Sequence, residues 1–389
     1  MSSTTGTIFK ITTFGESHGP GVGVVIDGCP AGIELDLQAV QRELTRRRPG
    51  QNHLTTPRKE PDEFEILSGM HEGKTLGTSL TFFVRNTNQR AGDYNKWADI
   101  YRPSHADYTY DAKYGWRTPF GGGRASVRET IGRVAAGAVA GQILERELGV
   151  KAIAWVDSIG TVKSDVMSSP PTDREAVDAS LVRCPDARSS ERMIQLIEEI
   201  KKAGDSIGGT IGAVITGVPP GLGDPVFDKL EADMARACLS IPACKGFESG
   251  SGFAGTEKPG SENNDEFLPA EADSDDRVAA ADGSRDIYSI PRLKTRTNRS
   301  GGIQGGISNG MPIVVRLAFK STATIHRTQQ SVNDQGEARE ILVGGRHDPC
   351  VLPRAVPIVE SVLNLTLIDA YLRQRAVHPD WWLRYRTNS

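Results

Sequence analysis

The hydrophobic residues of this chain fall into short runs and helical stripes, which predict a mixture of strands and helices. Runs rich in β-branched, aromatic or aliphatic residues at 22–26, 80–84 and 312–319 are typical of strands. Between residues 193 and 200, apolar residues recur at i, i+3, i+4 and i+7, which is the spacing of a helix. The pattern therefore indicates a fold that uses both kinds of element along its length.

One plan occurs twice, in which a strand leads through a Pro-Gly turn into a helix. The segment Val25–Gly32 resembles Val214–Gly221, and helix candidates follow at Asp36–Arg47 and Asp228–Cys238. The first of these helices begins at an acidic residue that is expected to cap it. We interpret the likeness as a two-fold internal repeat within one domain that covers residues 1–389. The alternative is chance similarity between two turns.

Two further helices are predicted to be longer and more apolar. One covers Ser126–Leu148, with Gly149 after its end, and the other covers Ile358–Leu372, with Pro357 near its start. The first is rich in alanine and glycine at 135–141, although glycine in a helix costs about 1 kcal/mol relative to alanine. Close approach of a neighbouring element would offset that loss, so we expect this helix to be buried.

Composition narrows the class of protein. The chain has 389 residues, of which 38% are hydrophobic and 24% charged, as in ordinary globular proteins. No apolar run approaches the roughly 18–20 residues that span a bilayer, and the N-terminus lacks the apolar core of a secretion signal. We therefore expect a cytoplasmic protein without membrane contact. The net charge of −3 argues against nucleic-acid binding, although three arginines at 46–48 form a local basic stretch.

Two local features of composition complete this picture. The five cysteines lie far apart and form no C-x-x-C pair, so neither a disulfide framework nor a metal site is indicated. Residues 250–297 are rich in glycine, serine and acidic residues and have weak periodicity. They are expected to form a long surface loop within the domain rather than a second domain.

The most distinctive candidate for chemistry is a serine–histidine pair between glycines, just before the strand at 22–26. Residues 15–21 read Gly-Glu-Ser-His-Gly-Pro-Gly, and glycine permits both sharp turns and close approach of a ligand. In this setting His18 is able to donate a proton near neutral pH. The alternative is a structural turn with a hydrogen-bonded histidine, and the residue order is not that of a nucleophile elbow.

Two more segments combine basic residues with histidine or glycine. Residues 102–111 place His105 among arginine, tyrosine and aspartate, without the spaced second ligand of a metal site, so proton transfer to an anionic ligand is favoured. Residues 121–130 lead three glycines and a serine into the long helix, where backbone N–H groups, Arg124 and Arg128 suit a phosphate. A serine-capped helix with solvent-facing charges is the alternative.

Two glycine-rich segments lie nearer the C-terminus. Residues 298–306 carry paired glycines, against which a flat ligand can lie or which form a simple hairpin. Residues 344–350 place Arg346, His347 and Asp348 in sequence, which suits an anion and a base together or, alternatively, a surface ion pair. All these segments together indicate an enzyme that acts on a phosphorylated or carboxylated small molecule, without naming its reaction.

Taken in order, the segments resemble the chorismate synthase family. From about Ile8 to about Arg375, the likeness is carried by residues 15–30, 46–51, 102–108, 122–137 and 346–360. It implies an α+β fold of two similar halves whose sheets sandwich helices, and a homotetramer. It also implies a lyase that converts 5-enolpyruvylshikimate 3-phosphate into chorismate and phosphate by a 1,4-anti elimination of phosphate and the C6 proton. Reduced FMN is the implied cofactor, without net redox change, in the last common step toward the aromatic amino acids.

The resemblance also assigns roles by position. His18 matches the proton donor to the departing phosphate, His105 the histidine that maintains the protonation state of the flavin, and Asp348 the acid that assists deprotonation of the substrate ring. Contacts with substrate phosphate are implied for Arg47, His53, Ser126, Arg128 and Arg346. Contacts with the flavin are implied for Arg124, Ala125, Ser126, Pro242, Ala243, Gly305, Lys320, Ser321, Thr322, Ala323, Thr324 and Arg346.

Four departures from the family pattern carry expectations of their own. His53 stands where the family usually has arginine, which predicts phosphate binding that is more sensitive to pH. Ala125 lacks the hydroxyl of a frequent serine, Ser321 replaces a common proline, and the segment 250–297 is longer than usual. No dinucleotide fingerprint is present, which favours an external flavin reductase as partner, with NADPH as the indirect reductant.

Two other hypotheses compete with the lyase. One is a non-catalytic binder of phosphorylated ligands on the same scaffold, and the other is a nucleic-acid binder that uses the arginines at 46–48. The retained His18, His105 and Asp348 favour the enzyme over the first. The net charge and the lack of interleaved aromatic residues disfavour the second.

Overall fold

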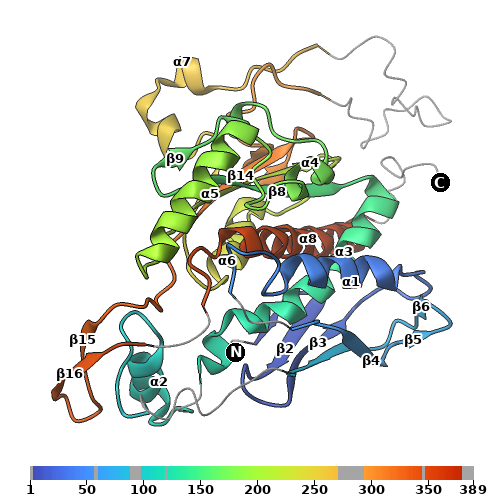
Figure 1. Ribbon diagram of the computed structural model, residues 1–389. Coiled ribbons are helices and arrows are strands. Elements are labelled where there is room, and N and C mark those ends of the chain that lie inside the picture. Colours follow the sequence, from blue (N-terminus) through green and yellow to red (C-terminus); the bar gives the residue numbers. More distant parts are fainter. Residues whose placement is uncertain are drawn as a thin grey trace, which may run out of the picture.

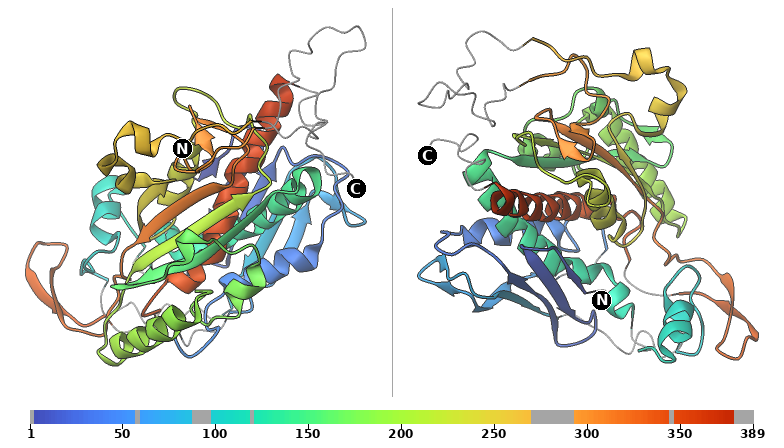
Figure 2. Two further views of the ribbon diagram at one scale, coloured as in Figure 1. Left: turned by 90° about the horizontal axis from the view of Figure 1, so that it is seen from above. Right: turned by 180° about the vertical axis from the view of Figure 1, so that it is seen from behind.

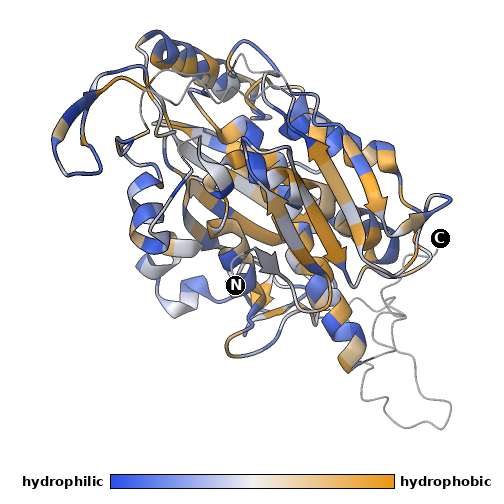
Figure 3. Cartoon of the chain, turned by 90° about the horizontal axis from the view of Figure 1, so that it is seen from below, coloured by the Kyte–Doolittle hydropathy of each residue, from blue (hydrophilic) through white to orange (hydrophobic). Residues whose placement is uncertain are grey.

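Two antiparallel sheets enclose a layer of helices in the computed structural model of the protein (Figures 1 and 2). The structure describes residues 3–56, 60–87, 98–118, 121–269, 293–343 and 347–378. Hydrophobic residues gather along the strands, whereas the peripheral hairpins and loops are mostly hydrophilic (Figure 3). The predicted α+β fold, with sheets on either side of helices, is confirmed.

The first sheet comes from the N-terminal part of the chain. Its order is β1–β2–β3–β7–β4, and all neighbouring strands are antiparallel. The strands are β1 (Thr4–Thr5), β2 (Lys10–Gly15), β3 (Gly21–Asp27), β4 (Phe64–Ser68) and β7 (Leu80–Arg85). Between β4 and β7 the chain makes a small hairpin of β5 (Met70–His71) and β6 (Lys74–Thr75). The two predicted strands in this half are therefore confirmed as β3 and β7.

The second sheet has the order β11–β14–β10–β8–β9 and is also antiparallel. Its strands are β8 (Lys151–Ile159), β9 (Val162–Lys163), β10 (Gly209–Thr216), β11 (Cys244–Ser249) and β14 (Ile313–Phe319). Helices α4 (Arg174–Asp178) and α5 (Ala187–Lys202) pack against β8 and β9. Because helices cover both faces at β8, all its residues after Lys151 are buried, with no polar alternation.

Both predicted strand–turn–helix units are formed. Strand β3 is followed by α1 (Leu37–Arg47), and β10 is followed by α6 (Leu230–Leu239). Each strand is the central member of its five-stranded sheet. The carboxylate of Asp36 accepts a hydrogen bond from Ala39 N at 3.0 Å and so caps α1 as expected. The two-fold internal repeat itself stays a prediction.

The middle of the molecule is the packing of α3 (Thr130–Leu148) against α8 (Leu352–Val377). At the contact, a Cβ on Gly137 would lie 2.6 Å from the Cα atom of Ser361, so no side chain fits there. The predicted burial of α3 and its reason are confirmed. The helix begins at Thr130 rather than Ser126, because the preceding residues form the 3-10 turns Gly123–Ala125 and Val127–Glu129.

Helix α8 starts six residues earlier than predicted, so that Pro357 lies inside it. Proline has no N–H to offer the carbonyl of Pro353 one turn before. Arg183 Nη1 donates to that carbonyl instead, and the ladder is closed without a buried unpaired acceptor. Helix α8 is long and apolar enough to cross a membrane, but most of it is buried in the protein, so the helix belongs to the core.

Two peripheral regions frame this body. Helix α2 (Asp107–Tyr114) lies beside a hairpin of β15 (Gln329–Val332) and β16 (Ala338–Ile341) (Figures 1 and 2). Of the predicted loop 250–297, the structure describes 250–269 and 293–297. These parts are mostly exposed and carry only the 3-10 segment Gly252–Glu257 and the short α7 (Gly260–Asn263); the remainder lies outside the described residues.

Candidate functional site

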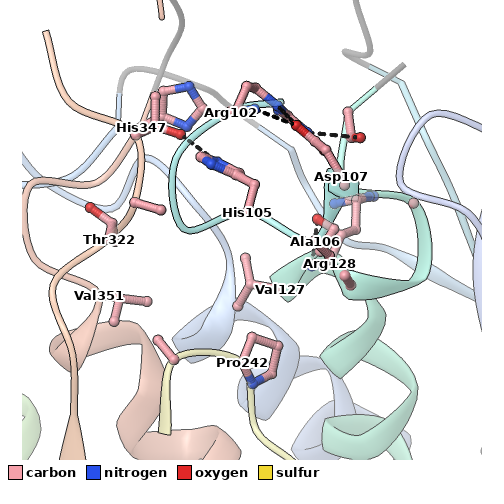
Figure 4. Close-up of a pocket in the computed structure, with 18 of the residues that line it drawn as sticks. Arg102, His105, Ala106, Asp107, Val127, Arg128, Pro242, Thr322, His347 and Val351 are labelled. Atoms are coloured by element: carbon pink, nitrogen blue, oxygen red, sulfur yellow. Dashed lines mark hydrogen bonds and ion pairs between the residues drawn. The ribbon is translucent and has the colours of Figure 1, made fainter. Parts of the chain in front are cut away.

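A cavity of about 830 Å³ opens where segments from most of the chain converge. In the first half of the chain, its border is formed by the β2–β3 turn, the end of α1, the start of α2 and the turns before α3. In the second half, it is formed by the loop before β11, the segment after β14 and the start of α8 (Figure 4). Pockets of this size hold a large ligand or two smaller ones together. The predicted site residues that line it are His18, Arg47, His105, Ala125, Ser126, Arg128, Pro242, Ala243, Lys320, Ser321, Thr322, Ala323, Thr324 and Asp348.

Two buried arginines on one side of the cavity share a single carboxylate. Asp62 accepts hydrogen bonds from Arg47 Nη1 at 3.1 Å and from Arg128 Nη1 at 2.9 Å, one on each oxygen. Glu60 adds a second carboxylate, 3.7 Å from Arg128 Nη2. We call these four residues the arginine cluster. Burial lowers the pKa of Arg47 to about 9, which leaves the guanidinium charged at neutral pH. The cluster therefore presents oriented cationic donors at the cavity edge.

The turns before α3 use some of the backbone donors that were predicted to bind an anion. The N–H groups of Ala125 and Ser126 donate to Gly122 O and Gly123 O, at 2.8 and 3.3 Å. The N–H of Arg128 donates to the Ser126 hydroxyl at 3.3 Å. The 3-10 turns therefore use these three donors, which are not free to bind an anion.

His18 sits in the β2–β3 turn, packed against a glycine. Its Nδ1 lies 3.1 Å from the Ser17 hydroxyl, and its ring borders the cavity. A Cβ on Gly121 would come within 2.4 Å of the ring, and Gly121 also has a φ of +69°. The missing side chain of Gly15, in contrast, makes room for the carbonyl of Gly21, 2.1 Å from where its Cβ would be. The glycine that His18 needs is therefore Gly121, from another segment.

His105 is held in a defined tautomer. Its Nδ1 lies 3.1 Å from Pro103 O, which only accepts, so Nδ1 carries the proton. Its Nε2 lies 3.0 Å from the Thr324 hydroxyl. Burial, aided by the charge of Arg102, lowers the pKa of His105 and favours the neutral ring. Arg102 is itself paired with Asp107 through two bonds of 2.7 and 2.8 Å at the start of α2 (Figure 4).

Asp348 is anchored on both oxygens. Oδ1 accepts a hydrogen bond from Thr56 N at 2.9 Å, and Oδ2 pairs with Arg354 Nη1 from the first turn of α8. Its backbone carbonyl accepts from the Thr322 hydroxyl at 3.0 Å, which ties the segment after β14 to the start of α8. Arg354 Nε also donates to Arg47 O at 3.2 Å. Asp348 is thus linked through Arg354 to the arginine cluster.

The whole chain matches known proteins of one kind. The sequence model of the family "Chorismate synthase" matches residues 9–372. A chorismate synthase of Leptospira biflexa serovar Patoc (strain Patoc 1 / Ames) is 54% identical over 386 residues, which are 99% of this chain and 98% of that protein. One from Synechococcus sp. (strain WH7803) is 57% identical over 381 residues, 98% of this chain and 100% of the relative. The chain belongs to the chorismate synthase family.

A solved structure agrees with this assignment. A crystal structure of chorismate synthase covers 95% of this chain and 93% of its own, with a TM-score of 0.71 and 30% sequence identity. As a member of the chorismate synthase family, the protein is an enzyme, a lyase that acts on a small molecule. The fold and activity class that the resemblance implied are confirmed.

Three residues expected at the ligands of a chorismate synthase do not line the cavity. Arg124 donates to Thr13 O at 3.0 Å and Gly15 O at 3.1 Å, and so braces β2. His53 lies 3.1 Å from Glu198 with its side chain 60% exposed. Gly305 forms the turn of the hairpin β12 (Ile303–Gln304) and β13 (Ile307–Ser308), so the hairpin interpretation of this segment holds. Arg346 lies outside the described residues.

Other lining residues carried no assigned role in the sequence. Arg354 was missed because it stands among the apolar residues at the start of α8, and no local sequence pattern indicates that it pairs with Asp348. Arg102 stands in the segment 102–111 and pairs there with Asp107, but it was given no role of its own. Glu60, which does not line the cavity, was missed because its partner Arg128 is far away in the sequence. His347 stands in the Arg-His-Asp motif, which suggested an anion and a base together, but the resemblance gave it no role of its own. Burial lowers the pKa of His347 to about 4. Lys320, for which a flavin contact was expected, has a pKa that burial lowers, and it adds a cation beside the hydroxyl groups of 321–324.

These donors suit an organic anion better than a metal. Within the described ranges, no three histidine, cysteine or carboxylate side chains gather as metal ligands. The cavity instead combines arginine, lysine, histidine and hydroxyl donors with the apolar side chains of Val127, Pro242 and Val351. That mixture fits a flat ring with a phosphate, as in FMN, together with a phosphorylated substrate.

Proposed function

We propose that this member of the chorismate synthase family converts 5-enolpyruvylshikimate 3-phosphate into chorismate and phosphate by 1,4-anti elimination, with reduced FMN as cofactor. The supporting observation is the convergence of His18, His105 and Asp348 on one cavity that also carries the arginine cluster. These three residues come from segments far apart in the chain. The reaction completes the common route to the aromatic amino acids.

Loss of phosphate needs compensation of charge on the leaving oxygens. Arg47 and Arg128 offer donors that Asp62 already orients, so little reorganisation is needed when charge develops. His18 is placed to protonate a phosphate oxygen, with Ser17 beside its Nδ1. Reduced FMN, when bound, supplies electron density to the substrate as phosphate departs.

The other two residues act on the ring side of the cavity. His105, neutral and protonated on Nδ1, keeps Nε2 and the Thr324 hydroxyl next to the flavin and holds its protonation state. Asp348 assists deprotonation of the substrate ring, and its bonds to Thr56 and Arg354 fix the carboxylate in place. Lys320 and the hydroxyls of Ser321, Thr322 and Thr324 hold the cofactor.

We also propose a cytoplasmic homotetramer that receives reduced flavin from an external reductase, with NADPH as the indirect electron source. Exposed apolar side chains support association, since Phe227 is 90% exposed and Phe253 is 78% exposed. Turnover with NADPH and FMN alone, without a reductase, would contradict the external source.

The deciding experiment is anaerobic turnover. Purified protein, chemically reduced FMN and 5-enolpyruvylshikimate 3-phosphate should release phosphate and chorismate in equal amounts. Binding of both ligands without any release would instead favour a non-catalytic phosphate binder. The variants His18→Ala and His105→Ala should keep the fold and FMN binding but lose most turnover, by about 10²-fold or more for an acid–base group. Near-normal turnover in either variant would remove its assigned role.

A further inference from the structure

One polar atom in the cavity is left unused by the proposed mechanism. Nε2 of His347 is shielded from solvent and forms no hydrogen bond within the described part of the chain, and the side chain lines the cavity. Buried polar atoms in folded proteins nearly always have a partner, because leaving one unpaired costs about 1–3 kcal/mol. Because this nitrogen lines the cavity, a ligand that enters it is able to supply the partner.

The surroundings of His347 decide its charge state. Arg102 and, when they are protonated, His105 and His326 place positive charge nearby, whereas the carboxylate of Asp348 opposes them. Burial acts in the same direction as the cations, so the ring is neutral at neutral pH. A neutral imidazole has one N–H and one lone pair, and its partner must supply a matching acceptor or donor without needing a charge.

The position of His347 selects which ligand meets it. Figure 4 shows its ring on the same side of the cavity as His105 and Arg102, away from Pro242 and Val351. The hydrogen bond from the Thr322 hydroxyl to Asp348 O holds the segment 320–324 against the backbone next to His347. A ligand bound by 320–324 therefore lies against His347 as well. In the proposed function that ligand is the flavin.

We infer that His347 forms a direct hydrogen bond through Nε2 with the ring of bound FMN. The inference rests on the proposed function for the identity of the ligand. The ring edge of a flavin carries both N–H donors and carbonyl or nitrogen acceptors, so it can match either state of a neutral Nε2. His347 is then a third histidine of the site, one that binds and does not transfer a proton.

Three variants separate this bond from ring packing. His347→Gln places an amide near the position of Nε2, His347→Phe keeps a ring without nitrogen, and His326→Gln changes an exposed neighbour that does not line the cavity. Titration of oxidised FMN, followed by flavin fluorescence, should show binding about five- to tenfold weaker for His347→Phe, as expected for one lost hydrogen bond. The FMN affinity of His347→Gln should stay within about threefold of the wild-type value, and the affinity of His326→Gln should equal the wild-type value.

A second measurement on the unaltered enzyme does not depend on how the variants fold. In protein with ¹⁵N-labelled histidine, the Nε2 resonance of His347 should move when FMN is added alone. The inference would be overturned if the resonance moved with the phosphorylated substrate alone, or if neither ligand moved it, as for a nitrogen bonded to water. Wild-type FMN affinity in His347→Phe would overturn it as well. Wild-type protein that binds no FMN would overturn the proposed function too, whereas full turnover with unchanged affinity in His347→Phe would overturn the inference only.

Discussion

The two sides of the cavity are built in different ways. On the arginine side, Arg47, Arg128 and Arg354 are paired with Asp62, Glu60 and Asp348 by short contacts between buried groups. On the histidine side, His105 is neutral and bonded to a carbonyl and a hydroxyl, and Nε2 of His347 has no partner in the described chain. One side is satisfied before any ligand arrives, and the other is completed by a ligand.

This difference predicts how substitutions divide. Buried charges that satisfy one another are part of the folded core, so their loss should reduce stability and activity together. Polar atoms whose hydrogen-bond partner is a ligand contribute little to folding, so their loss should change ligand affinity more than stability. Variants that fail to divide in this way would break the comparison.

The largest effect is expected for Arg47→Met on the arginine side. Arg47 is only 1% exposed, and its removal leaves the Asp62 carboxylate facing Arg128 alone. We expect the free energy of unfolding to fall by about 3–5 kcal/mol, as for other broken buried pairs, and phosphate release to become undetectable. Urea denaturation and a phosphate assay give the two readouts.

Arg42→Met is the matched control for that variant. Arg42 lies on the same helix α1 and pairs with Asp36 at 2.9 Å, but its side chain is 65% exposed. Its denaturation midpoint and turnover should match those of the wild type, since exposed pairs contribute little. Equal losses in both variants would show that α1 itself, and not the cluster, is sensitive.

The next largest effect is expected for Gly121→Ala, which connects the two sides through His18. Both Gly121 and Gly115 have positive φ, +69° and +73°, but only at Gly121 would a Cβ meet another residue, the His18 ring. Each alanine should reduce stability by about 1–2 kcal/mol because of the backbone conformation. Only Gly121→Ala should also reduce phosphate release, by about 10²-fold if the ring is displaced by 1 Å. An active Gly121→Ala enzyme would mean that His18 tolerates displacement.

A smaller effect concerns acid stability on the histidine side. In the folded protein the pKa of His347 is lowered from 6.5 to about 4, so below pH 6.5 the unfolded chain binds a proton that the folded protein does not. Stability therefore falls as the pH decreases from 6.5 to 4, by about 3 kcal/mol for this group. His347→Gln should remove that part of the slope in denaturation curves between pH 7 and 4. A slope as steep as that of the wild type would place the loss elsewhere.

The smallest effect is expected for His53→Arg, which restores the residue usual in the family. His53 lies at the surface against Glu198 and does not line the cavity. The Michaelis constant for the phosphorylated substrate should therefore change by less than about twofold, at pH 6 as well as at pH 8. A pH-dependent change of tenfold would instead support the phosphate contact that the sequence suggested.

Local signals in the sequence predicted most of the fold. Asp36 marks the start of α1 because capping depends on the next three residues, and the glycines of α3 revealed that a neighbour approaches closely. The start of α8 was placed too late, because an internal proline normally ends a helix. Here Arg183, far away in the chain, satisfies the carbonyl that Pro357 leaves open. Such compensation has no local signature.

The site residues in local motifs could also be predicted from the sequence, whereas their partners from distant segments could not. His18, His105 and Asp348 lie in distinctive motifs, and the structure brings them to one cavity. The partners that position them, such as Gly121 and Arg354, come from other segments and could not be assigned. For Arg124 the motif suggested a ligand contact, whereas in this structure its bonds brace strand β2, and the ligand contact stays a prediction.

The order of synthesis gives helix α8 a further consequence. A ribosome releases α3 and the second sheet before it releases residues 352–377, and both α3 and that sheet pack against α8. Until that helix docks, a nascent chain exposes the glycine-rich face of α3 to water and to other chains. We therefore expect ribosome-bound chains stalled before α8 to be sensitive to protease and to bind chaperones, and release of the last helix to end both states together.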